Sequence, residues 1–381
     1  MSVFSYNIMI FRLLGMWYPE DNNSAWKKIF YIFYTTLIVS IYYTNAISQI
    51  IILFGSLDDA KEFSGASFIT ITRILVCYKM YNILSKRKYI IHIINTLETG
   101  SFKARDSVEL SIQTKFSRKI KLLIITYGAL CATTLTALLY VSILVDIPQR
   151  KLAFEAWLPV NTSIPIFYWI VFIYQHFSGY CGTSISVSFD TVLVGSMILL
   201  CAQLNILKYR LRHGHNNNEI ENKSEKKYLI DCIEHHKAIY ELAELSNEAF
   251  SNAIFLQYFA SLIVLCVSSF QLSQEKPFTK KFNDLILYLI CQLLQVFMFC
   301  YWATQVQVES ENIITGVYDC EWLSLSITTK KNLILTMVRA LKPIQYSSGY
   351  VVNLSLTEFT NLLRMSYSIY SILQQSNSRT R

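Results

Sequence analysis

The segment that most constrains this chain is KIFYIFYTTLIVSIYYTNAISQIIILF, residues 28–54, which carries no charged side chain after Lys28. A helix rises about 1.5 Å per residue, so roughly 20 apolar residues cross the ~30 Å hydrocarbon layer of a bilayer. The whole chain has the same character, since 53% of its residues are hydrophobic and only 16% are charged, against ~25% charged residues in ordinary globular proteins. These features predict a polytopic membrane protein rather than a soluble one.

Further apolar runs of similar length follow along the chain. The predicted transmembrane spans lie at residues 28–54, 60–84, 120–146, 164–210, 250–272, 284–306 and 352–374. The fourth run is too long for a single crossing, so a helix there must extend beyond the bilayer at one or both ends. The predicted fold class is therefore an all-α polytopic membrane protein with seven transmembrane helices.

Lysine and arginine are distributed unequally between the two sides of these spans. One set of connecting segments holds 24 of them and the other set holds 8. The richer set comprises residues 1–28, 79–121, 208–246 and 307–349. Because basic residues are enriched in cytoplasmic loops, the N-terminus is predicted to be cytoplasmic and the C-terminus extracellular. Asn161 begins an Asn-Thr-Ser sequon in an external loop and is a candidate glycosylation site.

Two segments outside the spans have a predicted role on the cytoplasmic side. Residues 1–27 have no basic start and no small-residue cleavage site, so they are interpreted as a cytoplasmic segment rather than a signal peptide. Residues 307–350 are too polar to span a membrane but have an apolar side. We interpret them as a cytoplasmic helix that packs on other helices, with an interfacial helix lying on lipid as the alternative. The fourth and fifth spans also continue inward, which predicts a helical cytoplasmic layer.

No motif in the sequence indicates catalysis or metal binding. His213, His215, His235 and His236 lack a matching set of Cys or carboxylate residues and are interpreted as solvated surface. The nine cysteines include no CxxC pair and lie mostly inside apolar runs, as small buried hydrophobes do. Neither a Gly-rich phosphate loop nor a nucleophile elbow is recognisable. An enzyme, a metal site and a cofactor are therefore not expected.

The last predicted span carries an ordered set of polar residues. Their spacings are four, four, three, four and three, which places them on one helical face. They are Asn353, Thr357, Asn361, Arg364, Ser368 and Ser371. Polar groups are costly against lipid, so this face is expected to meet water or protein, and a hydroxyl-rich helix interface is the alternative to a water-filled pore. Two further charges, Arg73 and Asp190, lie inside spans, where they either pair with each other or bond locally.

Other seven-span or multi-span classes fit the sequence less well. A G-protein-coupled receptor has an external N-terminus, and its Asp/Glu-Arg-Tyr and Asn-Pro-x-x-Tyr signatures are missing here. A secondary transporter is expected to show repeated halves with helices broken by Gly or Pro at matching places. The chain has 11 Gly, 6 Pro and no visible repeat, which argues against a transporter.

The C-terminal part of the chain resembles insect odorant receptors. The resemblance extends from about residue 309 to residue 375 and rests on YDCEWLSLSITTKKNLILTMVRALKPI followed by GYVVNLSLTEFTNLLRMSYSIYSIL. Weaker similarities are FRLLGMWYPE near the start and EHHKAIYELAELSNEAF before the fifth span. The related gustatory receptors end in Thr-Tyr, five apolar residues and Gln-Phe. Here six residues separate Ser366-Tyr367 from Gln374, so a gustatory-type receptor is the less similar alternative.

The resemblance implies a subunit of a ligand-gated, non-selective cation channel in the plasma membrane of an olfactory sensory neuron. In that family four subunits surround a central pore, and most members assemble with a shared co-receptor subunit through the cytoplasmic helical layer. The chain would then divide into functional segments. These are a cytoplasmic segment (1–27), six transmembrane helices with a ligand pocket in the outer half (28–306), a cytoplasmic anchor helix (307–350), a pore-lining helix (351–375) and an extracellular tail (376–381).

The resemblance also implies two sets of site residues. A gate near the outer end of the last helix corresponds to Ser366, Tyr370 and Gln374, a face adjacent to the one that carries Asn361, Arg364, Ser368 and Ser371. The choice between these two faces stays open. A pocket for a small apolar odorant, formed mainly by the second, third, fourth and sixth spans, is expected to include Phe68, Thr72, Thr136, Tyr140, Tyr180, Ser184, Tyr288 and Gln292.

Overall fold

The computed structural model describes residues 3–18, 25–56, 60–97, 100–152, 156–157, 160, 162–213, 222–320, 322, 325–348 and 352–379. Seven long helices dominate these residues. They are α2 (Ala25–Gly55), α3 (Ala60–Thr96), α4 (Ser107–Val145), α5 (Pro165–His213), α6 (Asn222–Gln274), α7 (Lys280–Glu311) and α10 (Leu356–Arg379). Each of them contains the greater part of one predicted span, so the all-α fold with seven long helices is confirmed.

The remaining elements are short. They are α1 (Ser5–Leu13), the 3₁₀ turn η1 (Gly100–Phe102), α8 (Ile313–Tyr318), α9 (Ile327–Ala340) and the strands β1 (Ser347–Ser348) and β2 (Val352–Asn353). The single cytoplasmic helix expected over residues 307–350 is therefore divided. Helix α7 runs on to Glu311, and α8 and α9 follow as separate helices. Helix α9 begins at an N-cap, where the Ser326 side chain accepts a hydrogen bond from the Thr329 amide.

Five of the long helices are apolar enough to cross a membrane by length and composition alone: α2, α4, α5, α6 and α7. The other two predicted spans, α3 and α10, contain more polar residues. Helix α5 has 49 residues and α6 has 53, which at 1.5 Å per residue gives lengths of roughly 70–80 Å. Both exceed twice the hydrocarbon thickness, so they extend well beyond the bilayer, as the sequence indicates for the fourth span.

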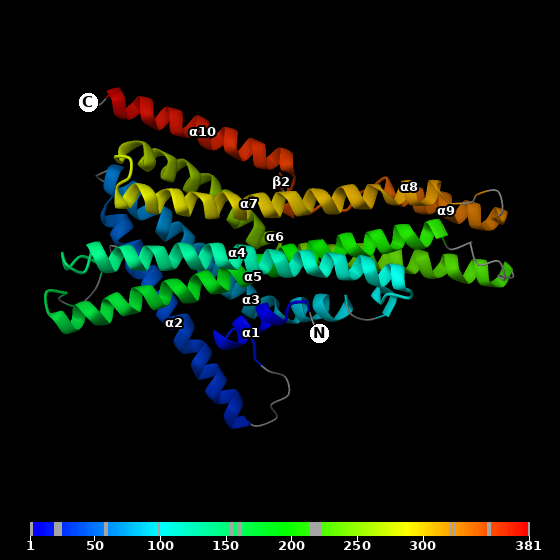
Figure 1. Ribbon diagram of the computed structural model, residues 1–381, viewed down its shortest axis with the longest axis horizontal. Coiled ribbons are helices and arrows are strands. Elements are labelled where there is room, and N and C mark those ends of the chain that lie inside the picture. Colours follow the sequence, from blue (N-terminus) through cyan, green and yellow to red (C-terminus); the bar gives the residue numbers. More distant parts are fainter. Residues whose placement is uncertain are drawn as a thin grey trace.

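Helices α4, α5, α6 and α7 run along the longest dimension of the molecule, with α8 and α9 at one end, whereas α2 crosses this direction steeply (Figure 1). The last turn of α4, the first turn of α5, the α6–α7 connection and the last turn of α10 lie at the opposite end. Helix α5 is the central element, because 89% of the residues in its apolar stretch are buried inside the bundle. It packs against α1, α2, α3, α4, α6, α7 and α8. A helix that is hydrophobic all round is expected in such a position.

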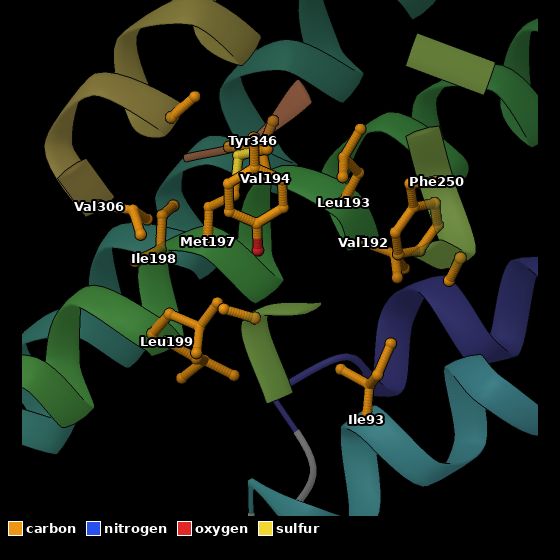
Figure 2. Close-up of a cluster of buried hydrophobic side chains, with 14 of the residues drawn as sticks. Ile93, Val192, Leu193, Val194, Met197, Ile198, Leu199, Phe250, Val306 and Tyr346 are labelled. Atoms are coloured by element: carbon orange, nitrogen blue, oxygen red, sulfur yellow. The ribbon is translucent and has the colours of Figure 1, made fainter. Parts of the chain in front are cut away.

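The core around α5 draws on elements far apart in the sequence (Figure 2). Val194, Met197 and Ile198 of α5 lie close to Val306 of α7 and Tyr346, which precedes β1. The Tyr346 hydroxyl donates to Ser246 Oγ at 3.2 Å, and Ser246 Oγ lies 3.2 Å from Ser196 Oγ. A buried tyrosine is expected to find such a partner.

Helix α1 is fixed against the bundle by one side of α5. Asn7 Nδ2 donates to the Ser188 carbonyl at 3.0 Å and to Thr191 Oγ1 at 2.6 Å. Phe4 packs over Gly195, where a Cβ atom would lie 2.5 Å from the Phe4 ring. Only glycine accommodates the ring at this approach.

A buried polar cluster joins the end of the fourth predicted span to residues outside the spans. Arg210 of α5, 1% exposed, donates to both carboxylate oxygens of Glu109 at 2.7 Å, and to His235 Nδ1 at 3.1 Å. Because a guanidinium only donates, His235 accepts through Nδ1 and donates through Nε2 to Gln203 Oε1, at 3.1 Å. His235 and His236 are 0% and 4% exposed. The interpretation of these two histidines as solvated surface is therefore wrong.

Both histidines are held in the neutral form. Burial lowers the pKa of His235 from 6.5 to about 3, and the Arg210 and Arg105 cations add to this effect. Burial and the Arg339 cation lower the pKa of His236 to about 4. At pH values between these folded-state pKa values and the pKa near 6.5 of an unfolded histidine, the unfolded chain binds more protons than the folded chain. Stability is therefore lost as the pH falls below about 6.5.

We expect acid to destabilise the protein through His235. At pH 5 the free energy of unfolding falls by about 2 kcal/mol for such a histidine relative to pH 7.5. A His235→Gln variant should lose less stability over the same interval, measured as the shift in melting temperature of the detergent-purified protein. His213→Gln, at an exposed site on α5, is the matched control and should behave as the wild type. Equal shifts in all three proteins would contradict the assignment.

Candidate ligand cluster and pore helix

Helix α10 is held at its start by α6, α7 and the β1–β2 hairpin. Ser347 pairs with Asn353 across the antiparallel strands, and the Ser347 amide donates to Asn247 Oδ1 of α6 at 3.0 Å. The Leu356 amide, at the first residue of α10, donates to Thr304 Oγ1 of α7 at 3.0 Å. Such contacts fix the direction in which α10 leaves the hairpin, beside α6 and α7 (Figure 1).

Two contacts in the first turn of α10 complete this attachment. The Tyr258 hydroxyl of α6 donates to the Glu358 carbonyl at 3.3 Å. The Phe297 ring of α7 meets the Phe359 ring edge to face, with the ring centroids 5.6 Å apart. Beyond this turn, Leu362 is fully buried against the same helices.

The polar and buried sides of α10 are opposite each other. At 100° per residue, Leu362 and Ser366 point about 160° away from Arg364, and both are buried. Thr357, Thr360, Arg364 and Ser368 are exposed and lie on one stripe. We call these four residues the α10 polar stripe.

The candidate pore residues are distributed over these sides. Arg364, Ser368 and Gln374 are exposed. Tyr370 and Ser371 are half-buried. Ser366 is 8% exposed, and its hydroxyl donates to the Leu363 carbonyl of its own helix at 2.9 Å. Asn361 is half-buried and donates through Nδ2 to Glu358 Oε1 at 3.2 Å. Ser366 thus lies on the packed side of α10, away from Arg364.

Three of the predicted ligand residues meet between α3 and α7. The Thr72 and Tyr288 hydroxyls are hydrogen-bonded to each other, and the Phe68 and Tyr288 rings lie 5.1 Å apart between centroids. Because Phe68 and Thr72 are four residues apart, they share one face of α3. We call Phe68, Thr72 and Tyr288 the ligand cluster. It offers two aromatic faces and two hydroxyls, the type of lining that binds small apolar molecules.

The other predicted ligand residues lie in different surroundings. Gln292, one turn from Tyr288 on α7, is buried and donates to Ser261 Oγ of α6 at 2.8 Å. Tyr180 and Ser184 of α5 are half-buried. Thr136 and Tyr140 lie on the exposed side of α4, where Tyr140 is 63% exposed. Asn161, the candidate glycosylation site, lies outside the described residues.

A buried ion pair at the centre of the bundle was not found from the sequence. Lys79 Nζ of α3 lies 2.7 Å from Asp190 Oδ1 of α5, and the side chains are 3% and 0% exposed. The sequence left open whether Arg73 and Asp190 pair with each other or bond locally, and the structure does not pair them. Arg73 instead donates to Ser178 Oγ at 3.2 Å and lies over the Tyr42 ring. Lys79 was missed because the charge count assigned it to a cytoplasmic segment, whereas α3 continues to Thr96.

Comparisons with known proteins agree with this architecture. The sequence matches the family model described as 7tm Odorant receptor over residues 59–367. The chain belongs to the odorant receptor family. Relatives of this receptor include Odorant receptor Or1 of Anopheles gambiae, which is 22% identical over 98% of this chain and 95% of the relative. Odorant receptor 46a, isoform A, of Drosophila melanogaster is 23% identical over 96% of each chain.

The fold of this odorant receptor also occurs in solved structures. The olfactory receptor OR5 from Machilis hrabei in complex with eugenol superimposes with a TM-score of 0.86 at 18% identity, covering 98% of this chain and 97% of OR5. A second structure of OR5 gives a TM-score of 0.87 at 17% identity, covering 97% of each chain. The predicted family and function are thereby confirmed: the chain is an odorant receptor, a subunit of a ligand-gated cation channel in a membrane, and the metabotropic and gustatory alternatives are not favoured.

Proposed function

We propose that the α10 polar stripe lines the ion pathway of this odorant receptor. The observation that carries the proposal is the exposure of the stripe on the side opposite to α6 and α7. An arginine facing lipid at this depth would cost a few kcal/mol, whereas water in a central pore hydrates it. Residues 351–375 then form the pore helix, and Arg364, Ser368 and Gln374 supply pore-facing groups, with Asn361 and Ser371 at the margins of the stripe.

The pore requires other subunits to close it. We infer that four subunits surround it, with a shared co-receptor subunit among them, and that they meet through the layer formed by α8 and α9. In support, α9 leaves several large apolar side chains exposed on the single chain. They are Ile327, Ile334, Leu335 and Val338, with Leu341 directly after the helix. Exposed apolar patches of this kind mark protein interaction sites. The N-terminus lies in the cytoplasm, and the plasma membrane of an olfactory neuron is the location.

The ligand is a small, largely apolar odorant that binds at the ligand cluster in the outer half of the membrane. Two rings and a hydroxyl pair favour a molecule bound by dispersion with one polar contact. The eugenol complex of OR5 supports a ligand of this size. Gln292 supplies the polar boundary of the pocket below Tyr288. Tyr180, Ser184, Thr136 and Tyr140 are further candidates from the neighbouring helices.

A recording without second messengers tests this function. The receptor and the co-receptor subunit are expressed together, and an odorant panel is applied to excised outside-out patches that lack nucleotides. At least one odorant is expected to open a cation current that reverses near 0 mV, with none in patches from cells expressing the co-receptor subunit alone. Odorant responses that appear only in intact cells and need a G protein would contradict the proposal.

Replacing Tyr288 with phenylalanine is expected to change ligand potency alone. The variant keeps the aromatic ring and removes the hydroxyl that bonds Thr72. A neutral hydrogen bond contributes about 1 kcal/mol, so the half-maximal odorant concentration should shift roughly fivefold while unitary conductance is unchanged. Tyr318→Phe, at an exposed site on α8, is the matched control. A changed conductance with unchanged potency would place Tyr288 in the pore instead.

A further inference from the structure

A continuous chain of buried polar side chains crosses the bundle at the level of the Lys79–Asp190 pair. Gln295 Nε2 of α7 donates to Asp190 Oδ2. Gln257 Nε2 of α6 lies within hydrogen-bond distance of Gln295 Oε1 and of Ser261 Oγ, both at 3.2 Å. Ser261 Oγ in turn accepts from Gln292 Nε2 at 2.8 Å. We call Lys79, Asp190, Gln295, Gln257, Ser261 and Gln292 the polar chain.

The polar chain lies next to the ligand cluster along both α3 and α7. Thr72 and Lys79 are seven residues apart, so they share one face of α3. Tyr288, Gln292 and Gln295 follow one another at intervals of four and three on α7, again on one face. The Thr72–Tyr288 contact therefore lies on the same faces of α3 and α7 as Lys79, Gln292 and Gln295, which follow within one or two turns. From these residues the polar chain continues to Asp190 of α5 and to Gln257 and Ser261 of α6. A ligand that separates or rotates these hydroxyls acts directly on the turn that begins the chain.

Helices α6 and α7, which carry four of the polar-chain residues, also hold the pore helix α10. Gln257 belongs to the polar chain, and its neighbour Tyr258 donates to the Glu358 carbonyl in the first turn of α10. Gln295 belongs to the chain as well, and Phe297 two residues later packs on Phe359 of α10. A small rotation of α6 or α7 about its axis therefore changes the polar chain and the base of α10 together.

The polar chain contains one buried acceptor that is left unpaired. Gln257 Oε1 is buried and has no hydrogen-bond partner among the described residues. A buried acceptor left unpaired is unfavourable by about 1–3 kcal/mol, so the present arrangement does not satisfy the chain completely. Rotation of both amides together reverses the Gln257–Gln295 hydrogen bond, so that Gln295 Nε2 donates to Gln257 Oε1 and releases Asp190 Oδ2. This gives a second arrangement of the same side chains. Two discrete arrangements are what a switching element requires.

We propose that the polar chain transmits occupancy of the ligand cluster to α10, with Gln257 and Gln295 as positioning residues whose amides differ in orientation between the closed and open channel. The proposal rests on the proposed role of α10 as the pore helix. It assigns to these glutamines an effect on the gating equilibrium and none on ion conduction. Coupling of this kind changes how far a bound ligand shifts the closed–open equilibrium.

The test is the maximal open probability of Gln295→Met in channels formed with the co-receptor subunit. Methionine is similar in length, uncharged and suited to a core, and the Lys79–Asp190 pair stays intact. Open probability at saturating odorant, from noise analysis of patches, is expected to fall roughly three- to tenfold, the factor that corresponds to one hydrogen bond. Unitary conductance and reversal potential should not change. Gln257→Met should give a similar loss, and the double variant no more than either alone, because they share one hydrogen bond.

Gln307→Met is the matched control, since Gln307 lies on α7 away from the polar chain and bonds Glu311. Surface biotinylation separates the two explanations of a smaller current. A loss confined to the number of channels at the surface, with wild-type open probability in both variants, would overturn the proposal. A change in unitary conductance would also overturn it and would place the glutamines in the pore. The role of α10 is judged separately, by variants of the polar stripe.

Discussion

Replacing Asp190 with asparagine is expected to remove most of the receptor from the cell surface. The substitution leaves the Lys79 ammonium, 3% exposed, without its counter-charge inside the bundle. Breaking a buried ion pair by removing one partner costs about 3–5 kcal/mol, a large part of the 5–15 kcal/mol that stabilises a typical domain. Surface biotinylation and the melting temperature of the purified protein measure the loss.

A double variant separates the lost charge balance from lost packing. Lys79→Met combined with Asp190→Asn removes both charges, so surface expression should recover most of the way. Lys237→Met is the matched control, because Lys237 pairs with Glu241 on the exposed side of α6, where such a pair contributes little. Wild-type surface expression of Asp190→Asn alone would show that the Lys79–Asp190 pair does not stabilise the fold.

The second large effect is expected from Arg364→Gln. A cation exposed on the pore-facing stripe repels permeating cations, and water screens this interaction only in part over short distances. Removing the charge should raise the unitary cation conductance about twofold or more and shift the relative permeability toward divalent cations. Arg118→Gln, at an exposed site on α4, should leave both unchanged. The pore-facing assignment of Arg364 fails if its conductance and reversal potential equal those of the wild type.

The helices of this receptor were predictable because their signal is local. Apolar runs of the right length fix where α2, α4, α5, α6 and α7 lie, and no partner has to be known to recognise them. Thr357, Arg364 and Ser368 of the α10 polar stripe were predictable for the same reason, since a period of 3.6 residues is visible in one short segment. Thr360 was not among the predicted residues, and Asn361 and Ser371, which were, are half-buried. The division of residues 307–350 was not, because the chain changes direction there through contacts of α8 with α5 and α9.

The pairing of side chains across helices was not predictable from local pattern. Asp190 was recognised as a buried charge, but its partner is 111 residues away on a helix that extends further than its apolar part suggests. His235 looked like surface because its neighbours in the sequence are polar. Its burial is accommodated because Arg210 of α5, which is paired with Glu109 of α4, donates a hydrogen bond to the Nδ1 atom of His235. Both cases depend on the relative rotation of long helices, which composition does not determine.

The same limit applied to the last helix, where the sequence left two adjacent faces open. Both faces carry hydroxyls, so composition does not distinguish them. The packing of α10 on α6 and α7 buries Ser366 and leaves Arg364 and Ser368 exposed. The exposed side is therefore the one that we propose lines the pore.

Cysteine accessibility in the conducting channel tests the central claim most directly. Ser368→Cys and Ser366→Cys are each expressed with the co-receptor subunit and treated with a positively charged methanethiosulfonate reagent during odorant application, with the wild type as control for the native cysteines. The account predicts rapid, irreversible loss of the odorant-evoked current in Ser368→Cys and little change in Ser366→Cys. Block of Ser366→Cys with no effect on Ser368→Cys would contradict it.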